Sequence, residues 1–138
     1  MSTYRKPLPS LTDDATSQYW ERARQHQLVV PRCTACGTVF FYPRLRCPSC
    51  WSNDLEWIRA AETGTIWSLT WVHTPFFDDV WADDVPYCVA IVELDEGVRM
   101  VSAIVGVSPG DVSIGTQVRA VFDAVTPEVT LPKFELTR

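Results

Sequence analysis

The sequence contains no long hydrophobic run, and among its 138 residues there are only two histidines and six glycines. No segment approaches the roughly 20 apolar residues of a membrane-spanning helix. Residues 1–14, MSTYRKPLPSLTDD, lack the apolar centre of a secretory signal. We therefore expect a cytoplasmic protein with no membrane partner. The glycines also form no phosphate-cradling loop, which excludes that route to phosphate binding.

Basic residues are scarce in the second part of the chain. Residues 61–138 carry four Lys or Arg against twelve Asp or Glu, whereas residues 1–60 carry eight against five. The acidic part should repel a phosphate backbone, so we do not expect nucleic acid as a partner. Five arginines of the first part either face an anionic ligand or form a solvated surface: Arg22, Arg24, Arg32, Arg44 and Arg46.

Cysteine is also scarce, and four of the five cysteines fall in one motif. The stretch RCTACGTVFFYPRLRCPSC holds two Cys-x-x-Cys pairs separated by ten residues, Cys33 with Cys36 and Cys47 with Cys50. Each pair can fold into a tight knuckle, and two knuckles supply the four tetrahedral thiolates that Zn²⁺ prefers. We expect structural Zn²⁺ at this site, with iron bound in the rubredoxin manner as the alternative.

The expected metal site is closed, because four thiolates leave no position for water or substrate. Such a site stabilises a fold and performs no chemistry. Gly37 follows the first cysteine pair, where a knuckle commonly needs a positive φ, whereas Trp51 follows the second pair. We therefore expect the second knuckle to be distorted.

No other residues of the sequence assemble into a catalytic set. Cys88 lies within an apolar run, where a buried and inert thiol is favoured over a nucleophile. We expect His26 at the surface, at the end of a helix, whereas His73 at a strand end either binds a ligand or caps the strand. The sequence therefore predicts a chain that is not an enzyme by itself.

The order of patterns predicts three parts: an arm and helix in 1–30, a zinc ribbon in 31–60 and a barrel with a C-terminal tail in 61–138. TDDATSQYWERARQHQL has helical spacing, with Thr12 or Asp13 as its cap. The third part holds short β-branched and aromatic segments between turns, namely GTIWSLTWVHT, PYCVAIVEL, VRMVSAIVGV and TQVRAVFDAV. These antiparallel strands, without a convincing helix, predict a mainly β chain with a small closed or partly closed barrel.

Large aromatic side chains are more numerous than a small ribbon can bury. They occur in the helix, in the ribbon and in the acidic loop TPFFDDVWADDVP. They either pack within the chain or serve as anchors for a partner protein, since exposed apolar surface bordered by charge is typical of interfaces. The candidate interface residues are Tyr19, Trp20, Phe40, Phe41, Tyr42, Phe76, Phe77 and Trp81.

This order of segments resembles the zinc-ribbon and OB-fold accessory proteins of acyl-CoA metabolism. The resemblance extends from about Tyr19 to Phe134, and it is most specific in the four cysteines, the YPR between them and the hairpin PYCVAIVELDEGVR. It implies an N-terminal helical segment, a rubredoxin-like zinc ribbon and a C-terminal OB-fold barrel. The sequence departs from the family at Trp51, where glycine is usual, and in its last residues, KFELTR.

Members of that family commonly assemble with a thiolase-fold enzyme, or alternatively with a hot-dog hydratase, and supply no catalytic residue. The resemblance implies a noncatalytic subunit that helps to shape the acyl-CoA site of a thiolase or a lipid-transfer-protein-like aldolase, in steroid or aromatic degradation among other pathways. Two other functions stay open, a single-stranded nucleic-acid-binding protein and a freestanding acyl-CoA carrier. The candidate contacts for the CoA phosphates are Arg32, Arg44 and Arg46.

Overall fold

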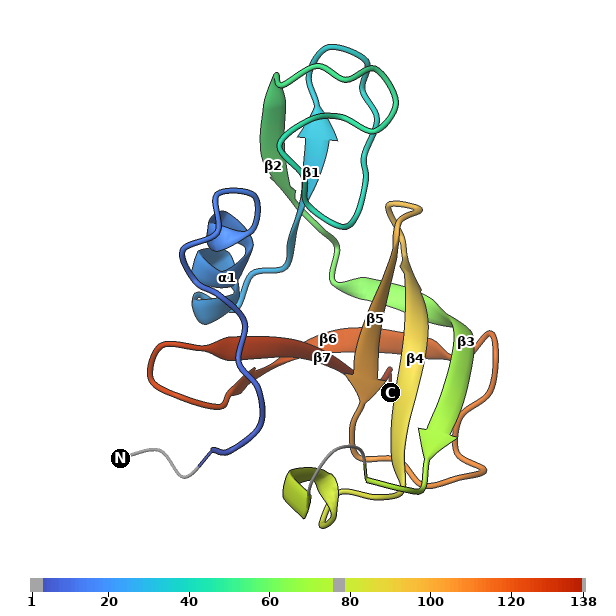
Figure 1. Ribbon diagram of the computed structural model, residues 1–138. Helices are drawn as coiled ribbons and strands as arrows, with labels where there is room; N and C mark the ends of the chain where they lie inside the picture. The colour runs from blue at the N-terminus through green and yellow to red at the C-terminus, as the bar shows by residue number, and fades with distance from the viewer. Residues whose placement is uncertain (1–3, 76–78, 138) are drawn as a thin grey trace.

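A two-stranded ribbon stands above a closed five-stranded barrel in the computed structural model, and an α-helix lies beside their junction (Figure 1). The structure describes residues 4–75 and 79–137. Within these two ranges, no helix has the length and apolar character that crossing a membrane requires. The mainly β fold with a barrel is confirmed.

Helix α1, Ser17–Arg24, is shorter than its sequence pattern predicted. Thr16 holds the cap position of α1 without a side-chain cap bond, whereas the predicted cap residue Asp13 caps the turn that leads into the helix. Its carbonyl oxygen accepts the N–H of Ser17 at 2.8 Å, and its carboxylate accepts the N–H of Ala15 at 3.2 Å. These are the bonds that an N-cap residue makes, formed here one turn ahead of the α-helix.

The ribbon consists of β1, Val29–Cys33, and β2, Leu55–Arg59, which pair antiparallel. Val29 and Val30 are fully buried and belong to the same core cluster as the barrel residues. The base of the ribbon therefore joins the core of the barrel. The cysteine loops extend from the other end of the strand pair (Figure 1).

The barrel closes in the order β3-β4-β5-β7-β6. In β4, side chains alternate between buried and half-buried along the strand, the period-2 pattern of a strand with one face on the core. The segment that we expected to form a C-terminal tail is strand β7, which pairs along its whole length with β6. The strands are β3 Thr63–Val72, β4 Tyr87–Leu94, β5 Arg99–Ile104, β6 Gln117–Ala124 and β7 Thr130–Leu136.

Gly64 lies where the barrel closes. It pairs with Leu94 of β4 on one side and with Val118 of β6 on the other. A Cβ atom at this position would lie 2.4 Å from the carbonyl oxygen of Glu93. Only glycine permits this close approach of two backbones.

The seam between β5 and β7 is the least regular part of the barrel. These parallel strands share a single register pair, Ile104 with Phe134. Pro132 has no N–H with which to extend the ladder, and its carbonyl oxygen accepts the hydroxyl of Ser102 at 3.0 Å. The seam is therefore held by this side-chain bond together with one backbone bond, from the N–H of Val105 to the carbonyl oxygen of Phe134 at 2.8 Å.

Two carboxylates fasten the ribbon to the barrel at the base of the ribbon. Glu62 accepts the N–H of Leu28 at 3.0 Å, and Glu96, in the turn between β4 and β5, accepts the N–H of Ala61 at 2.7 Å. Both bonds satisfy backbone donors that lie just outside the ribbon strands. Charged acceptors make such bonds stronger than neutral ones.

Candidate metal centre

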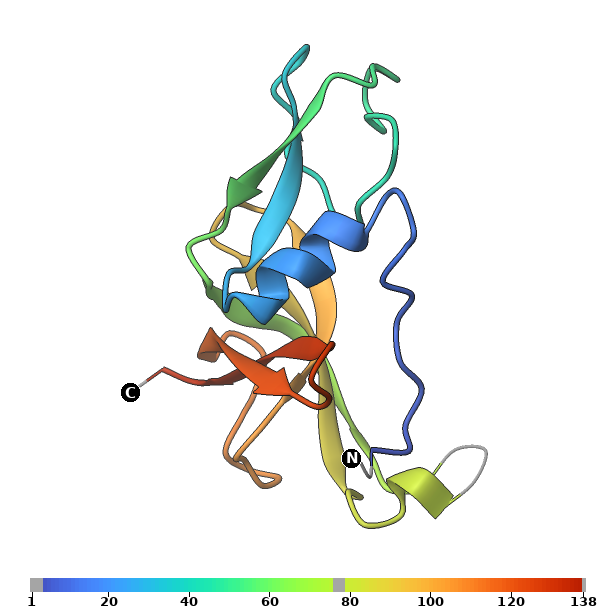
Figure 2. The same ribbon diagram turned by 90° about the vertical axis from the view of Figure 1, so that its left-hand side faces the viewer.

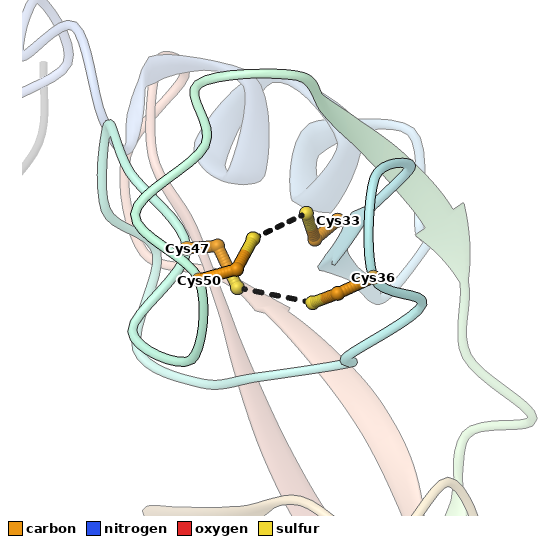
Figure 3. Close-up of side chains that lie close together, drawn as sticks. All are labelled: Cys33, Cys36, Cys47 and Cys50. Carbon is orange, nitrogen blue, oxygen red and sulfur yellow. Dashed lines mark hydrogen bonds between the residues drawn. The ribbon is translucent and has the colours of Figure 1, made fainter.

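Four cysteine sulfurs from two separate loops converge at the end of the ribbon (Figure 3). The Sγ atoms of Cys33 and Cys50 are 3.6 Å apart, as are those of Cys36 and Cys47, and all four lie within 4.8 Å of one another. Four thiolates at a Zn–S distance of about 2.3 Å in a tetrahedron place their sulfurs about 3.8 Å apart. The four cysteines therefore fit a tetrahedral metal ion.

The two knuckles have the same backbone geometry, so the expected distortion of the second one is wrong. The carbonyl oxygen of Cys33 accepts the N–H of Gly37 at 2.8 Å, and that of Cys47 accepts the N–H of Trp51 at 2.9 Å. Gly37 has a φ of 82° and Trp51 a φ of 66°. Trp51 thus adopts the left-handed conformation despite its Cβ, at a cost of about 1 to 2 kcal/mol.

Two of the four cysteines are buried, and the other two are accessible to solvent. Cys33 and Cys47 are fully buried, whereas Cys36 and Cys50 are exposed. The N–H of Ser49 donates to the sulfur of Cys47 at 3.3 Å, the kind of amide bond that stabilises a thiolate. With all four sulfurs facing one centre, the site has no open position for water or substrate.

Within the described ranges, the four cysteines form the one cluster of three or more potential metal ligands. His26 and His73 are both exposed and stand outside it. His26 stacks on Phe122, with ring centroids 5.2 Å apart. Cys88 is buried in β4, and its burial raises the pKa of the thiol.

The three candidate arginines of the ribbon differ in their surroundings. The guanidinium of Arg32 pairs with the carboxylate of Glu56 at 2.8 Å. Nη1 of Arg46 donates to the carbonyl oxygen of Trp51 at 3.1 Å. Arg44 is exposed on the loop between the two knuckles. The structure therefore places Arg44 and Arg46 on one loop, with Arg32 held against β2.

The candidate interface aromatics fall into three groups. Tyr19 and Phe40 are buried within this chain, and burial raises the pKa of Tyr19. Phe76 and Phe77 lie outside the described residues. The side chains that keep accessible surface are Trp20, Phe41, Tyr42 and Trp81.

A cleft of about 920 Å³ lies between the N-terminal arm and the barrel. It is lined by the arm, helix α1, ribbon residues 41–43 and the β4 and β5 strands, and Figure 2 shows the arm running down this side of the molecule. Lys6 of the arm pairs with Asp84 at 2.7 Å, and Lys133 pairs with Asp123 at 2.6 Å. The cationic side chains that line the cleft are thus already engaged by carboxylates.

Sequence reasoning missed two exposed apolar side chains beside the metal loops. Leu45 is 61% exposed and Trp51 is 70% exposed. The signal was available, because tryptophan followed a Cys-x-x-Cys pair at the place where Gly37 follows the other. The positive φ of Trp51 leaves its side chain at the surface and does not distort the knuckle.

Two family descriptions match consecutive parts of the chain. Residues 20–56 match "ChsH2, rubredoxin-like zinc ribbon domain". Residues 57–123 match "ChsH2, C-terminal OB-fold domain". The two matches meet inside β2, close to the junction of ribbon and barrel.

Two relatives are similar to this chain along most of its length. A "DUF35 domain-containing scaffold protein" from Methanothermobacter thermautotrophicus is 39% identical over 115 residues, which is 82% of this chain and 85% of the relative. A "Probable enoyl-CoA hydratase alpha subunit" from Thermomonospora curvata is 39% identical over 94% of this chain. The chain spans only 39% of the length of that hydratase subunit.

Solved structures agree with the family descriptions. The structure titled "Ltp2-ChsH2(DUF35) aldolase" matches with a TM-score of 0.81 and 36% identity, covering 93% of this chain and 98% of the matched one. A DUF35-family protein of unknown function from Sulfolobus solfataricus matches with a TM-score of 0.60 at 15% identity, which supports the fold alone. The resemblance drawn from the sequence is confirmed, and the chain belongs to the ChsH2 (DUF35) family of zinc-ribbon and OB-fold proteins.

Proposed function

We propose that this chain is a noncatalytic cytoplasmic subunit that binds and completes a thiolase-fold acyl-CoA enzyme, a thiolase or a lipid-transfer-protein-like aldolase. The observation that carries the proposal is the match along 98% of a chain in the Ltp2-ChsH2(DUF35) aldolase structure. Archaeal relatives named scaffold proteins support a structural role. The partner then supplies the nucleophile and the base, and this chain shapes the site around the CoA thioester.

Zn²⁺ is the proposed metal, with iron as the alternative that uses the same four thiolates. Cys33, Cys36, Cys47 and Cys50 would hold it. The ion would cross-link the two knuckles and supply no reactive group. Metal analysis of the purified chain should give one zinc per chain, and a well-folded chain without metal would contradict this assignment.

A hot-dog hydratase is the alternative partner, and two relatives favour it by name. Besides the Thermomonospora protein, a "3-oxo-4,17-pregnadiene-20-carboxyl-CoA hydratase alpha subunit" from Mycobacterium tuberculosis is 32% identical over 83% of this chain. This chain spans only 35% of that subunit, so most of the relative lies outside the shared part. Both candidate partners act on acyl-CoA thioesters, so the chemical class of ligand is the same.

Nucleic acid is not supported as a ligand. A barrel that binds single strands presents a positively charged groove with stacking aromatics. Here the lysines of the cleft are paired with aspartates, and the barrel part of the chain is strongly acidic. Oligonucleotide binding near 150 mM salt that weakens as salt is added would contradict this view.

We propose that the ribbon arginines face the CoA phosphates in the assembled enzyme. Arg44 and Arg46 are the better placed of the three, because the charge of Arg32 is neutralised by Glu56, whereas Arg46 bonds to the neutral carbonyl oxygen of Trp51. Replacing both with alanine should raise the KM for the CoA substrate about tenfold in the saturated complex. Arg119→Ala, on β6 beside Glu135, serves as the control and should leave the KM unchanged.

The aromatic side chains with accessible surface are the proposed anchors for the partner. Trp20 and Phe41 are half-buried, pack against the core of this chain and keep one accessible side. Truncating either to alanine should weaken assembly by about 1 to 3 kcal/mol. A fall in the stability of the free chain, with unchanged partner affinity, would assign these side chains to the core alone.

The experiment that tests the proposed function is a pull-down of the tagged chain from its native host, followed by identification and assay of the co-eluting enzyme. We expect a thiolase-fold subunit, with turnover of acyl-CoA by the complex and none by the isolated chain. A hydratase would replace the partner but retain the role of the chain. Turnover by the isolated chain that Cys88→Ala abolishes would overturn the noncatalytic assignment.

A further inference from the structure

The N-terminal arm, residues 4–12, has no role in the proposed function. It forms neither helix nor strand, and it runs along the barrel beside the cleft (Figure 2). Pro7 and Pro9 lack the N–H that pairing with a strand would use, so they keep this part of the arm out of the sheet. Side chains are therefore the main means by which the barrel can hold the arm.

The ammonium group of Lys6 joins the arm to the acidic loop of residues 79–84. Its Nζ atom lies 2.7 Å from the carboxylate of Asp84. It also lies over two aromatic rings, 5.1 Å from the centroid of Trp81 and 5.6 Å from that of Tyr4. An ammonium is attracted by the face of such a ring, and only 23% of the Lys6 side chain is exposed to solvent that would weaken these contacts. Lys6 and Asp84 thus form a latch between the arm and the loop.

The latch lies beside an aromatic wall of the cleft. Tyr4 and Lys6 line the cleft from the arm. Trp81 and Tyr87 line it from the barrel side, with their ring centroids 5.5 Å apart. The lining includes five more aromatic side chains, those of Tyr19, Trp20, Phe41, Tyr42 and Trp71. Moving the arm away would expose more of this wall to water, and the hydrophobic effect therefore favours the closed arrangement.

We propose that the arm is a strap over the cleft, and that the Lys6 latch controls the access of apolar molecules to the aromatic wall. The other end of the strap is fixed, because Asp13 bonds to the turn before α1 and this helix packs on β7 and β1. None of residues 4–12, all of which the structure describes, is fully buried. A segment without regular structure and with few buried contacts opens at a low free-energy cost. Loss of one ammonium group is therefore enough to release the strap.

The variant Lys6→Glu tests the latch, because it places a second carboxylate beside Asp84. The probe is bis-ANS, a dye that fluoresces on exposed apolar surface, added to the free, metal-loaded chain. We expect its fluorescence to rise about fivefold, as follows from losing an ion pair and a cation–π contact. Fluorescence equal to that of the wild type would overturn the strap.

Arg5→Glu is the matched control, because it makes the same change of charge on the neighbouring residue. The guanidinium of Arg5 is 3.9 Å from the carboxylate of Asp79, and both side chains are largely exposed. This variant should leave the dye fluorescence unchanged. A rise equal to that of Lys6→Glu would overturn the latch, since the overall charge of the arm would then account for the effect.

Exchanging the two charges of the latch is the stricter test. Asp84→Lys alone should open the strap as Lys6→Glu does. The double variant that carries both changes should return the fluorescence to the wild-type level, because the ion pair forms again with reversed signs. Fluorescence that stays high in the double variant would contradict the assignment of this ion pair as the latch.

Removal of residues 1–9 separates the strap from the fold. It should raise dye fluorescence at least as much as Lys6→Glu, while metal content and Tm stay at their wild-type values. A fall in metal content and Tm would overturn the proposal, since the arm would then be part of the fold. Each measurement uses the free chain, so its result is independent of the partner enzyme and of the proposed function.

Discussion

The ribbon and the barrel differ in how much apolar surface each buries. The cysteine loops and β2, residues 34–59, bury the side chains of Phe40 and Cys47, whereas Val29 and Val30 of β1 belong to the core shared with the barrel. The barrel buries side chains from all five of its strands, including the fully buried Ile66, Val92, Leu94, Val118 and Phe134. A segment that buries so little cannot offset the entropy of ordering its backbone through the hydrophobic effect.

This difference predicts which part of the chain depends on the metal for its stability. The knuckles are held by four backbone hydrogen bonds that repeat between them and by the convergence of four sulfurs. In small modules of this type, the free energy of metal binding supplies the free energy of folding. The barrel, by contrast, has a core that requires no ion. We therefore expect the stability of the ribbon to depend on the metal and that of the barrel to depend on packing.

The largest expected effect is that of Cys47→Ser. Structural zinc contributes on the order of 10 kcal/mol in small peptide modules, so loss of one thiolate should release the metal and unfold the cysteine loops. Metal analysis and hydrogen exchange resolved by residue should show rapid exchange in residues 34–54. Protection should persist in β4 and β5.

Cys88→Ala is the control for this experiment, because it removes a buried thiol of the barrel and leaves the ligands intact. It should retain the metal. Global unfolding of Cys47→Ser, with loss of protection in β4, would contradict the separation of the two regions. That result would mean that the shared core around Val29 and Val30 couples them.

The sequence allowed prediction of the parts whose patterns have a single physical cause. The two Cys-x-x-Cys pairs predicted the grouping of the sulfurs, because each pair closes its own knuckle. The nearly continuous apolar run in PYCVAIVEL predicted β4, and the structure adds the alternation of buried and half-buried side chains along it. The residues DEG in PYCVAIVELDEGVR predicted the turn of a hairpin. In the structure, the N–H of Leu94 donates to the carbonyl oxygen of Val98 across this turn at 2.8 Å.

The errors arose where two physical effects compete. Asp13 makes the same bonds whether it caps a helix or closes a turn, so the sequence did not place the start of α1 at Ser17. The last residues, KFELTR, were expected to belong to a C-terminal tail, yet most of them lie in β7, which pairs with β6. Trp51 suggested strain that would distort the knuckle, whereas the backbone accommodates that strain without changing its hydrogen bonds.

A smaller loss of stability is expected from a substitution at Gly64, where the barrel closes. Gly64→Ala would place a Cβ 2.4 Å from the backbone oxygen of Glu93, so β3 and β4 must move apart. We expect a loss of about 1 to 3 kcal/mol in the free energy of unfolding, measured by urea denaturation with the metal retained. Gly97→Ala is the comparison, since a Cβ there meets no atom within 4 Å and its loss reports only the φ of 91°, which favours glycine. A larger loss at Gly97 than at Gly64 would show that its positive φ matters more than the contact between strands.

The smallest effect concerns the hydrogen bond by which the ribbon reaches the barrel edge. Tyr42 is half exposed, and its hydroxyl accepts the N–H of Val101 in β5 at 2.8 Å. Val101 is itself 52% exposed, so water can replace the lost acceptor. Tyr42→Phe should therefore reduce the free energy of unfolding by less than about 1 kcal/mol and lower Tm by no more than about 4 °C.

Hydrogen exchange at the amide of Val101 is the sharper measurement for this variant, because it reports that one donor directly. It should accelerate in Tyr42→Phe, while the amides of β1 and β2 keep their protection. Tyr42→Ala also removes the ring that lies 4.5 Å from the ring of Phe41, so it should destabilise the chain further. If Tyr42→Phe alone lowers protection throughout the ribbon, this hydroxyl couples the two regions strongly. The ribbon and the barrel would then have to be described as one cooperative unit.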